Sequence, residues 1–183
     1  MKHTSKYLKN YAMMCTALGV DPDALFTRGK ALLEYYRNFC RYADFLPPER
    51  EGNASYGLEF CNAFEELLKA SDPETVTERV SKERLSLRSL QYLMSMTLQQ
   101  ISIMEGDDKT YSMILENKYM LEKILTDADI MEMKGYCSSS YYIKLREAIA
   151  CYSLQLLRIA IPRYRQQLRA TEYEQALHPL EAI

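Results

Sequence analysis

The chain has 183 residues, 48% of them hydrophobic, which is enough to bury a core in one domain or a small two-part arrangement. Its cysteines, an odd number without a CxxC pair, predict neither a disulfide framework nor a zinc site and indicate reduced thiols: Cys15, Cys40, Cys61, Cys137 and Cys151. No stretch approaches the roughly 20 apolar residues that span a bilayer, and the start lacks a signal peptide's apolar segment, so we expect a cytoplasmic protein without a membrane partner.

The net charge of -2 conceals an uneven distribution of charge along the chain. Residues 134–170 carry seven basic side chains and a single acidic one, Glu147, whereas residues 1–133 have a net charge of -5 and residues 171–183 one of -3. A basic block in an otherwise acidic chain is typical of a segment that faces a polyanion such as DNA. A solvated helix face would account for the same charges.

Apolar residues recur at three- and four-residue spacing and no segment has a convincing strand pattern, which predicts an all-α fold. We expect a first helix over 5–17, closed by Gly19, and a second that begins with Asp21 as N-cap and Pro22 as first helical residue. The break at 47–53 precedes a third helix that ends near residue 70.

The fourth predicted helix is long, from about Pro73 to about Met104. A seven-residue repeat runs along it through Val80, Leu87, Met94 and Ile101, with Leu90 and Met104 at a second heptad position. Glu83 and Thr97 interrupt that second position, so two readings stay open: a homodimer through the 73–104 helix, or packing inside one subunit. Asp107 or Asp108 is then expected to cap a fifth helix, over 110–125.

The segment 126–157 has the spacing of a helix-turn-helix. Thr126 or Asp127 can cap a short helix whose inward side includes Ile130 and Met133 or its neighbour, and Gly135 provides the left-handed conformation of a sharp turn. Tyr136 is expected to fill the corner, and a second helix starts within 137–139. Its buried stripe is predicted to be Tyr141, Leu145, Ala148, Ile149 and Tyr152.

The opposite face of that second helix is the one that a recognition helix places in the major groove. The residues predicted to contact bases or backbone there are Ser138, Ser139, Tyr142, Ile143 and Arg146, and those predicted to lie near phosphates are Lys134, Lys144 and Arg158.

The run 129–141, followed by Leu145 and Ala148, resembles region 4 of sigma factors, where an acidic-Ile helix, a glycine corner and a serine-rich start precede a Leu and an Ala. The run 111–120 looks like the helix before that motif in phage regulators of the ArpU and RinA type. The resemblance covers about residues 108–157 and implies a regulator of prophage or mobile-element transcription. Cys137, Lys134 and Tyr141 depart from the family pattern, which has Ser, Leu and a small aliphatic residue there.

An enzyme is not predicted. The two histidines, His3 and His178, lie near the ends of the sequence, which disfavours a histidine dyad or a metal site. The adjacent acids at 65–66 and 107–108 point to different helix faces, and no glycine-rich phosphate loop is present. We therefore expect no catalytic residues, metal or cofactor.

These patterns predict an all-α protein with a helical body over 1–106, for dimerisation or partner binding, and a sigma-like helix-turn-helix DNA-binding domain over 107–170. An acidic tail over 171–183 completes it. The predicted function is a sequence-specific, DNA-binding transcriptional regulator whose partners are double-stranded DNA and RNA polymerase or another protein. The alternative is a helical adaptor without DNA binding, and its sign would be a recognition face covered by the N-terminal helices or the tail.

Overall fold

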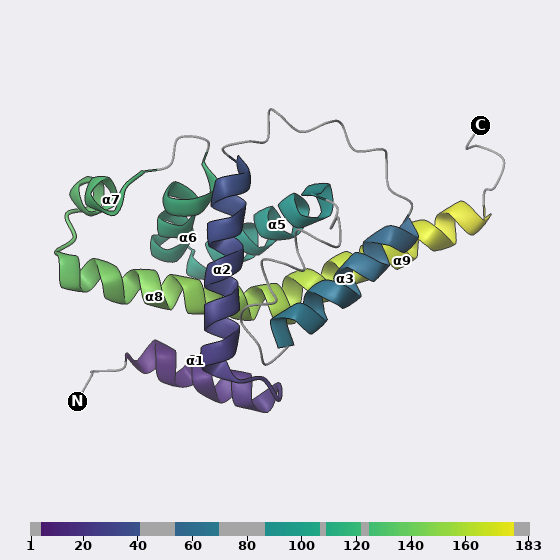
Figure 1. Cartoon of the computed structure of the whole chain (residues 1–183), viewed down its shortest axis with the longest axis horizontal. Coiled ribbons are helices and arrows are strands. Elements are labelled where there is room, and N and C mark those ends of the chain that lie inside the picture. The colour runs from purple at the N-terminus through teal and green to yellow at the C-terminus, as the bar shows by residue number, and fades with distance from the viewer. Residues whose placement is uncertain (1–4, 41–53, 70–86, 107–108, 122–124, 178–183) are drawn as a thin grey trace.

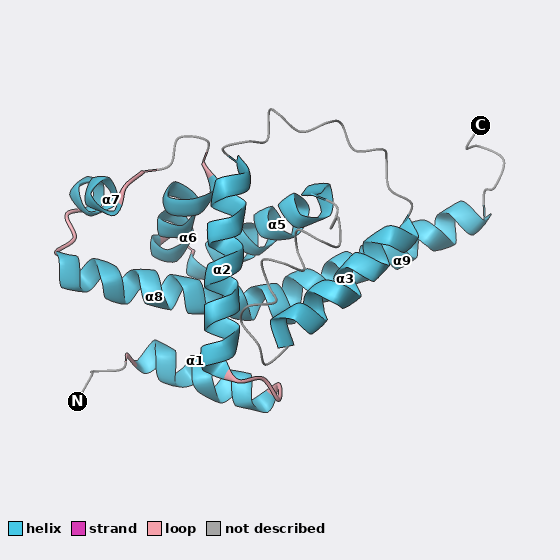
Figure 2. Cartoon of the chain, viewed as in Figure 1, coloured by secondary structure: helices cyan, strands magenta, loops and turns pink. Residues whose placement is uncertain are grey.

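The computed structural model describes residues 5–40, 54–69, 87–106, 109–121 and 125–177 (Figure 1). Throughout these residues the chain forms helices and short connections without a strand, which confirms the predicted all-α class (Figure 2). No helix within the described ranges combines the length and the apolar character needed to cross a membrane.

The longest helical element lies at the C-terminal end of the described chain. The helix α8 (Ser138–Gln155) continues through a π-helical turn, η3 (Leu156–Ala160), into α9 (Ile161–Leu177). Together they form a rod of about 60 Å at 1.5 Å per residue, drawn from green to yellow in Figure 1. Because Pro162 has no N–H to donate and its ring crowds the preceding turn, the wider π turn falls just before it.

The first two predicted helices are confirmed as α1 (Lys6–Ala17) and α2 (Pro22–Cys40). The Ser5 hydroxyl accepts a hydrogen bond from the Leu8 amide at 3.2 Å, and Asp21 accepts one from the Ala24 amide at 2.7 Å, so each helix has the cap its sequence provides. Gly19, at φ +68°, makes the left-handed turn between them.

Four helices surround the second half of α8: α1, α2, α5 (Leu87–Glu105) and α6 (Thr110–Leu115) all pack against it. As a result, the eleven consecutive residues from Glu147 to Leu157 are all buried. Helix α3 (Ala54–Lys69) lies along α9 instead, where Glu65 pairs with Arg165 at 2.5 Å. The other helices therefore pack around the rod of α8, η3 and α9. Of the predicted 73–104 helix, the structure describes residues 87–104, as part of α5.

The seven-residue repeat of α5 is buried within its own chain. Leu90, Met94 and Ile101 are fully or almost fully buried, against α6, α8 and η3, whereas Met104 is 60% exposed. Val80 lies outside the described residues. The structure therefore shows this stripe packed inside one subunit. A homodimer through α5 stays a prediction, and it would have to form through the exposed side of the helix.

The main core joins residues from Tyr11 to Ile161 in one cluster, so it crosses the domain boundary predicted at residue 106. The predicted fifth helix is α6 followed by a π-helical turn, η2 (Glu116–Met120), and it ends before residue 125. Its start is not capped by its N-cap residue, Lys109: the carboxylate of Glu105, on α5, accepts hydrogen bonds from the amides of Tyr111 (2.5 Å) and Ser112 (2.8 Å). Asp107 and Asp108 lie outside the described residues.

The closest approach between α2 and α8 depends on Gly29. A Cβ added there would lie 1.8 Å from the Ser153 hydroxyl oxygen and 2.7 Å from the Ser153 Cβ. We expect Gly29→Ala to destabilise the protein by about 1–3 kcal/mol, because the two helices must separate, as measured by denaturant unfolding. Combining it with Ser153→Gly should recover part of the loss, whereas Lys30→Ala, on the exposed side of α2, should change stability by less than about 0.5 kcal/mol. Equal stability of Gly29→Ala and wild type would contradict this packing.

Candidate nucleic-acid interface

The predicted short helix and glycine turn are present as α7 (Asp127–Lys134) and Gly135. Thr126 is the N-cap and forms a capping box with Asp129: the Thr126 hydroxyl accepts from the Asp129 amide at 3.2 Å, and the Asp129 carboxylate accepts from the Thr126 amide at 2.8 Å. Gly135 has φ +65° and ends the helix in the left-handed conformation. Helix α8 then begins at Ser138.

A second, small hydrophobic cluster holds α7 against the rest of the molecule. Ile130 of α7, Ile114 of α6 and Tyr141 of α8 are fully buried in it, and Tyr136 packs partly against them from the corner. Ile130 therefore faces inward as predicted. The prediction for Met133 or its neighbour is wrong, because residues 132–134 are exposed and Met131, two residues before Met133, makes the contact. Along α8 the predicted stripe is also confirmed, with Tyr141, Ala148, Ile149 and Tyr152 buried and Leu145 partly buried.

A polar contact reinforces this cluster. The carboxylate of Asp127 accepts a hydrogen bond from the Tyr141 hydroxyl at 2.6 Å and forms an ion pair with Lys118 of η2. Desolvation by burial raises the pKa of Asp127, but the hydrogen bonds from Lys118 and Tyr141 outweigh it, and the net effect is a lowered pKa. This contact is not predictable from the sequence pattern, because Lys118 and Asp127 belong to different elements.

The first nine residues of α8, Ser138 to Arg146, lie at one end of the molecule, below α7 in Figure 1. One side of this segment packs against α6 and α7 through Tyr141 and Leu145, and the other side is exposed. Five of the predicted DNA-contacting residues are exposed on this segment: Ser138, Ser139, Tyr142, Ile143 and Arg146. Tyr142 and Ile143 are each 50% exposed.

Arg146 and the three predicted phosphate contacts occupy different places. Arg146 lies over the ring of Phe26, on α2, with its guanidinium carbon 5.9 Å from the ring centroid. Lys134 is exposed at the end of α7, beside the turn. Lys144 is directed toward the body, where it lies 3.6 Å from the Glu147 carboxylate and over the Tyr111 ring.

Arg158 is exposed but contacts Met14 of α1, at 3.6 Å between Nη1 and Sδ. It lies about 30 Å along the rod from Ser138 at 1.5 Å per residue. Lys134 and Arg146 are therefore exposed near the start of α8, Lys144 lies on the same segment with its side chain turned to the body, and Arg158 lies apart from it.

The basic block seen in the sequence does not gather on one surface. Arg163 and Arg169 lie on α9, about 25 Å or more along the helix from Arg146, and Arg165 is paired with Glu65. Near the exposed end of α8, Lys134 and Arg146 are accompanied by the exposed acids Asp129 and Glu132 of α7. The local charge is consequently close to neutral.

Thiols and metal-ligating side chains are the alternative sources of chemistry in this chain. In the described part of the chain, no group of three or more His, Cys, Asp or Glu side chains could hold a metal ion, and both histidines lie outside that part. Cys15, Cys61 and Cys151 are buried, whereas Cys137 is exposed at the start of α8. A hydrogen bond with the Ser139 hydroxyl, at 3.3 Å, lowers the pKa of the Cys137 thiol.

No family model, no curated protein and no solved structure matches this chain.

The Asp127 contact predicts how the stability of this region depends on pH. Asp127→Asn should lower the free energy of unfolding at pH 7 by about 1–3 kcal/mol, because hydrogen bonds to a charged carboxylate are replaced by weaker ones. The folded-state pKa lies below the ordinary 3.8, so the stabilisation is fully present above pH 3.8 and is lost as the pH falls through the lower folded-state value. Denaturant unfolding at pH 7, 5, 4 and 3 should show the gap between the two proteins closing at the acidic end.

Glu132→Gln is the matched control, since it removes an exposed carboxylate from the same helix. We expect it to change stability by less than about 0.5 kcal/mol. A gap between wild type and Asp127→Asn that stays constant from pH 7 to pH 3 would show that the charge of Asp127 is not what stabilises the cluster.

Proposed function

We propose that this protein is a sequence-specific, DNA-binding transcriptional regulator that places the first turns of α8 in the major groove of double-stranded DNA. One observation carries the proposal: the first nine residues of α8 present an exposed face at the end of the molecule, directly after a short helix and a left-handed glycine turn. The following eleven residues of the same helix are buried on every side and hold that end in place.

The exposed segment has the dimensions that groove binding needs. Nine helical residues span about 13 Å, and the major groove of B-DNA is about 12 Å wide. Ser139, Tyr142 and Arg146 follow one another at three- and four-residue spacing, so they share a helix face. On that face a guanidinium can bond a guanine edge in bidentate fashion, hydroxyls can bond base edges or phosphate, and the adjacent Ile143 can contact a thymine methyl group.

Phosphate contacts would come from the turn and the helix start. The side chain of the α8 N-cap residue, Cys137, does not cap the helix, so the first amides of α8 are not satisfied in that way. A helix N-terminus favours an anion such as a DNA phosphate. Lys134, at the end of α7, would add a positive charge beside it.

The resemblance of residues 108–157 to sigma region 4 and to phage regulators of the ArpU and RinA type supports a role in prophage or mobile-element transcription. On this proposal the protein acts in the cytoplasm without a catalytic step, with double-stranded DNA as its first partner. RNA polymerase would be a second partner, reached through another surface.

A helical adaptor is the second candidate, and one observation favours it. Met133, Tyr142 and Ile143 are three large side chains exposed by half in the same part of the molecule, and methionine and aromatic residues are enriched in protein interfaces. The predicted sign of the adaptor, a covered recognition face, is not found among the described residues. We therefore prefer DNA as the ligand of this face.

The test is binding of a fluorescent random-sequence duplex to the purified protein at several salt concentrations, by anisotropy. With Lys134 and Arg146 as the basic side chains at the site, we expect a slope of log K against log salt of about -2, since each neutralised phosphate contributes about -0.9. Arg146→Ala should weaken binding to a selected target sequence by about 1–3 kcal/mol.

Arg169→Ala is the matched control, because it removes the same charge from an exposed position on α9. It should leave the affinity for the duplex unchanged. Absence of duplex binding even at low salt would contradict the proposed function. Equal losses in the two variants would contradict the proposed site.

A further inference from the structure

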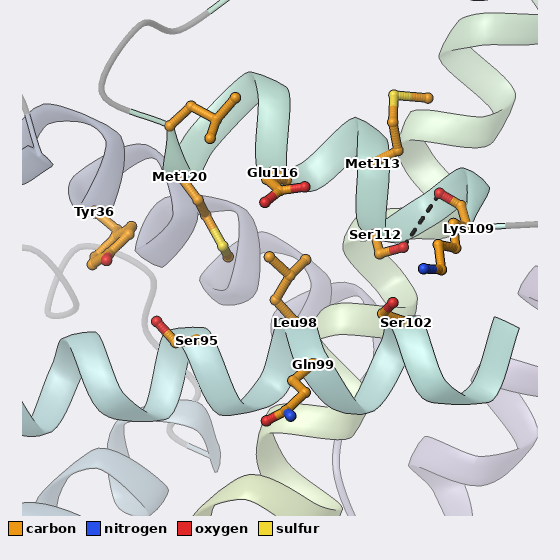
Figure 3. Close-up of a pocket in the computed structure, with 11 residues that line it drawn as sticks. Tyr36, Ser95, Leu98, Gln99, Ser102, Lys109, Ser112, Met113, Glu116 and Met120 are labelled. Atoms are coloured by element: carbon orange, nitrogen blue, oxygen red, sulfur yellow. Dashed lines mark hydrogen bonds between the residues drawn. The ribbon is translucent and has the colours of Figure 1, made fainter. Parts of the chain in front are cut away.

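A pocket of about 490 Å³ lies between α2, α5, α6 and η2, away from the exposed end of α8 (Figure 3). Its volume is within the range of about 300–1,000 Å³ that small-molecule sites occupy. Nothing in the proposed DNA contacts uses it.

The two charged residues of the pocket wall have opposite signs and stand at opposite ends of α6. Lys109 is the N-cap residue and Glu116 follows the last residue of the helix. Both line the pocket, and the seven residues between their positions correspond to about 10 Å along the helix axis from backbone to backbone. No ion pair joins either residue to another described residue, and both are exposed. The wall therefore offers a cation and an anion separated by two turns.

Lys109 also has the backbone geometry of a specialised position. Its φ of +44° is the only positive value at a non-glycine residue among the described residues. A left-handed lysine is uncommon, and such strain gathers at ligand-binding positions and switch regions. At the other charged end of the wall, η2 is a single π-helical turn, a form often found at functional sites.

The wall between the two charges is mixed in chemistry. Ser95, Gln99 and Ser102 line it from α5 with hydroxyl and amide groups, and Leu98, Met113 and Met120 add apolar surface (Figure 3). Peptide groups bond to hydroxyls and amides, and small aliphatic side chains suit a methionine- and leucine-lined surface. An extended tripeptide spans about 10 Å at 3.3–3.6 Å per residue, which matches the axial distance between the backbone positions of Lys109 and Glu116.

We propose that this pocket binds a short linear zwitterion of about the length of a tripeptide, with its carboxylate at Lys109 and its ammonium group at Glu116. Binding there changes the candidate interface through η2. Glu116 and Met120 line the pocket, and Lys118 between them pairs with Asp127 of α7. The transmission rests on the proposed function, whereas the binding does not.

Isothermal titration calorimetry of the full chain with trialanine tests the binding. We expect one saturable site with a Kd on the order of 1 mM or tighter, and at least tenfold weaker binding of trialanine that is acetylated and amidated at its ends. Lys109→Gln should weaken the binding of trialanine about tenfold while leaving that of C-terminally amidated trialanine unchanged. Glu116→Gln should show the same pattern with N-acetylated trialanine. Both residues are exposed, so the variants should fold as wild type does.

Absence of saturable binding, or equal binding of free and doubly capped trialanine, would overturn the pocket assignment. For the transmission, duplex affinity is measured with and without saturating trialanine, and a change of at least threefold is expected in wild type but not in Lys109→Gln. Trialanine binding that leaves duplex affinity unaltered would overturn the transmission alone. A protein that binds trialanine but no duplex would overturn the proposed function while the pocket stands.

Discussion

The burial of α8 on all sides from Glu147 to Leu157 is the constraint around which the other elements are arranged. A helix enclosed in this way needs neighbours on every face, and α1, α2, α5 and α6 provide them. Close approach requires a residue without a side chain, which explains Gly29 opposite Ser153. Because one helix continues from this core into the exposed segment, the positions of Tyr142 and Arg146 are fixed by packing that begins directly after Arg146 and continues for about three turns.

The attachment of α7 is different in character. Helix α7 has eight residues and buries one of them, Ile130, completely, so the ion pair from Lys118 and the hydrogen bond from Tyr141 to Asp127 contribute a large share of what holds it. A small cluster with a charged contact opens at lower free energy than a large apolar core. We therefore expect α7 and the turn before α8 to change position more readily than the rest of the candidate interface. Lys118, on η2, connects α7 to the pocket, because its neighbours Glu116 and Met120 line the pocket wall.

Local features were predictable from the sequence because they depend on neighbours in the chain: the caps at Asp21 and Thr126, the turn at Gly135 and the stripe from Tyr141 to Tyr152. Features that depend on which elements meet in space were not. Glu105 caps α6 from the preceding helix, and Lys118 reaches across to Asp127. The basic block illustrates the difference, since most of its charges are spread along a rod of about 60 Å. Near the start of α8, Lys134 and Arg146 are exposed, whereas Lys144 is turned toward Glu147. The predicted domain boundary at residue 106 also depends on contacts in space, because α5 and α8, on either side of it, share one core.

Cys137 provides the most direct test, since it stands at the start of α8 with an exposed thiol of lowered pKa, while Cys15, Cys61 and Cys151 are buried. The measurement is the rate of alkylation of Cys137 by a maleimide, followed by mass spectrometry of its peptide, with and without saturating duplex DNA. If the start of α8 enters the groove, the rate should fall several-fold with duplex and return when salt dissociates the complex. An alkylation rate that the duplex leaves unchanged would contradict the placement of DNA on this end of the molecule.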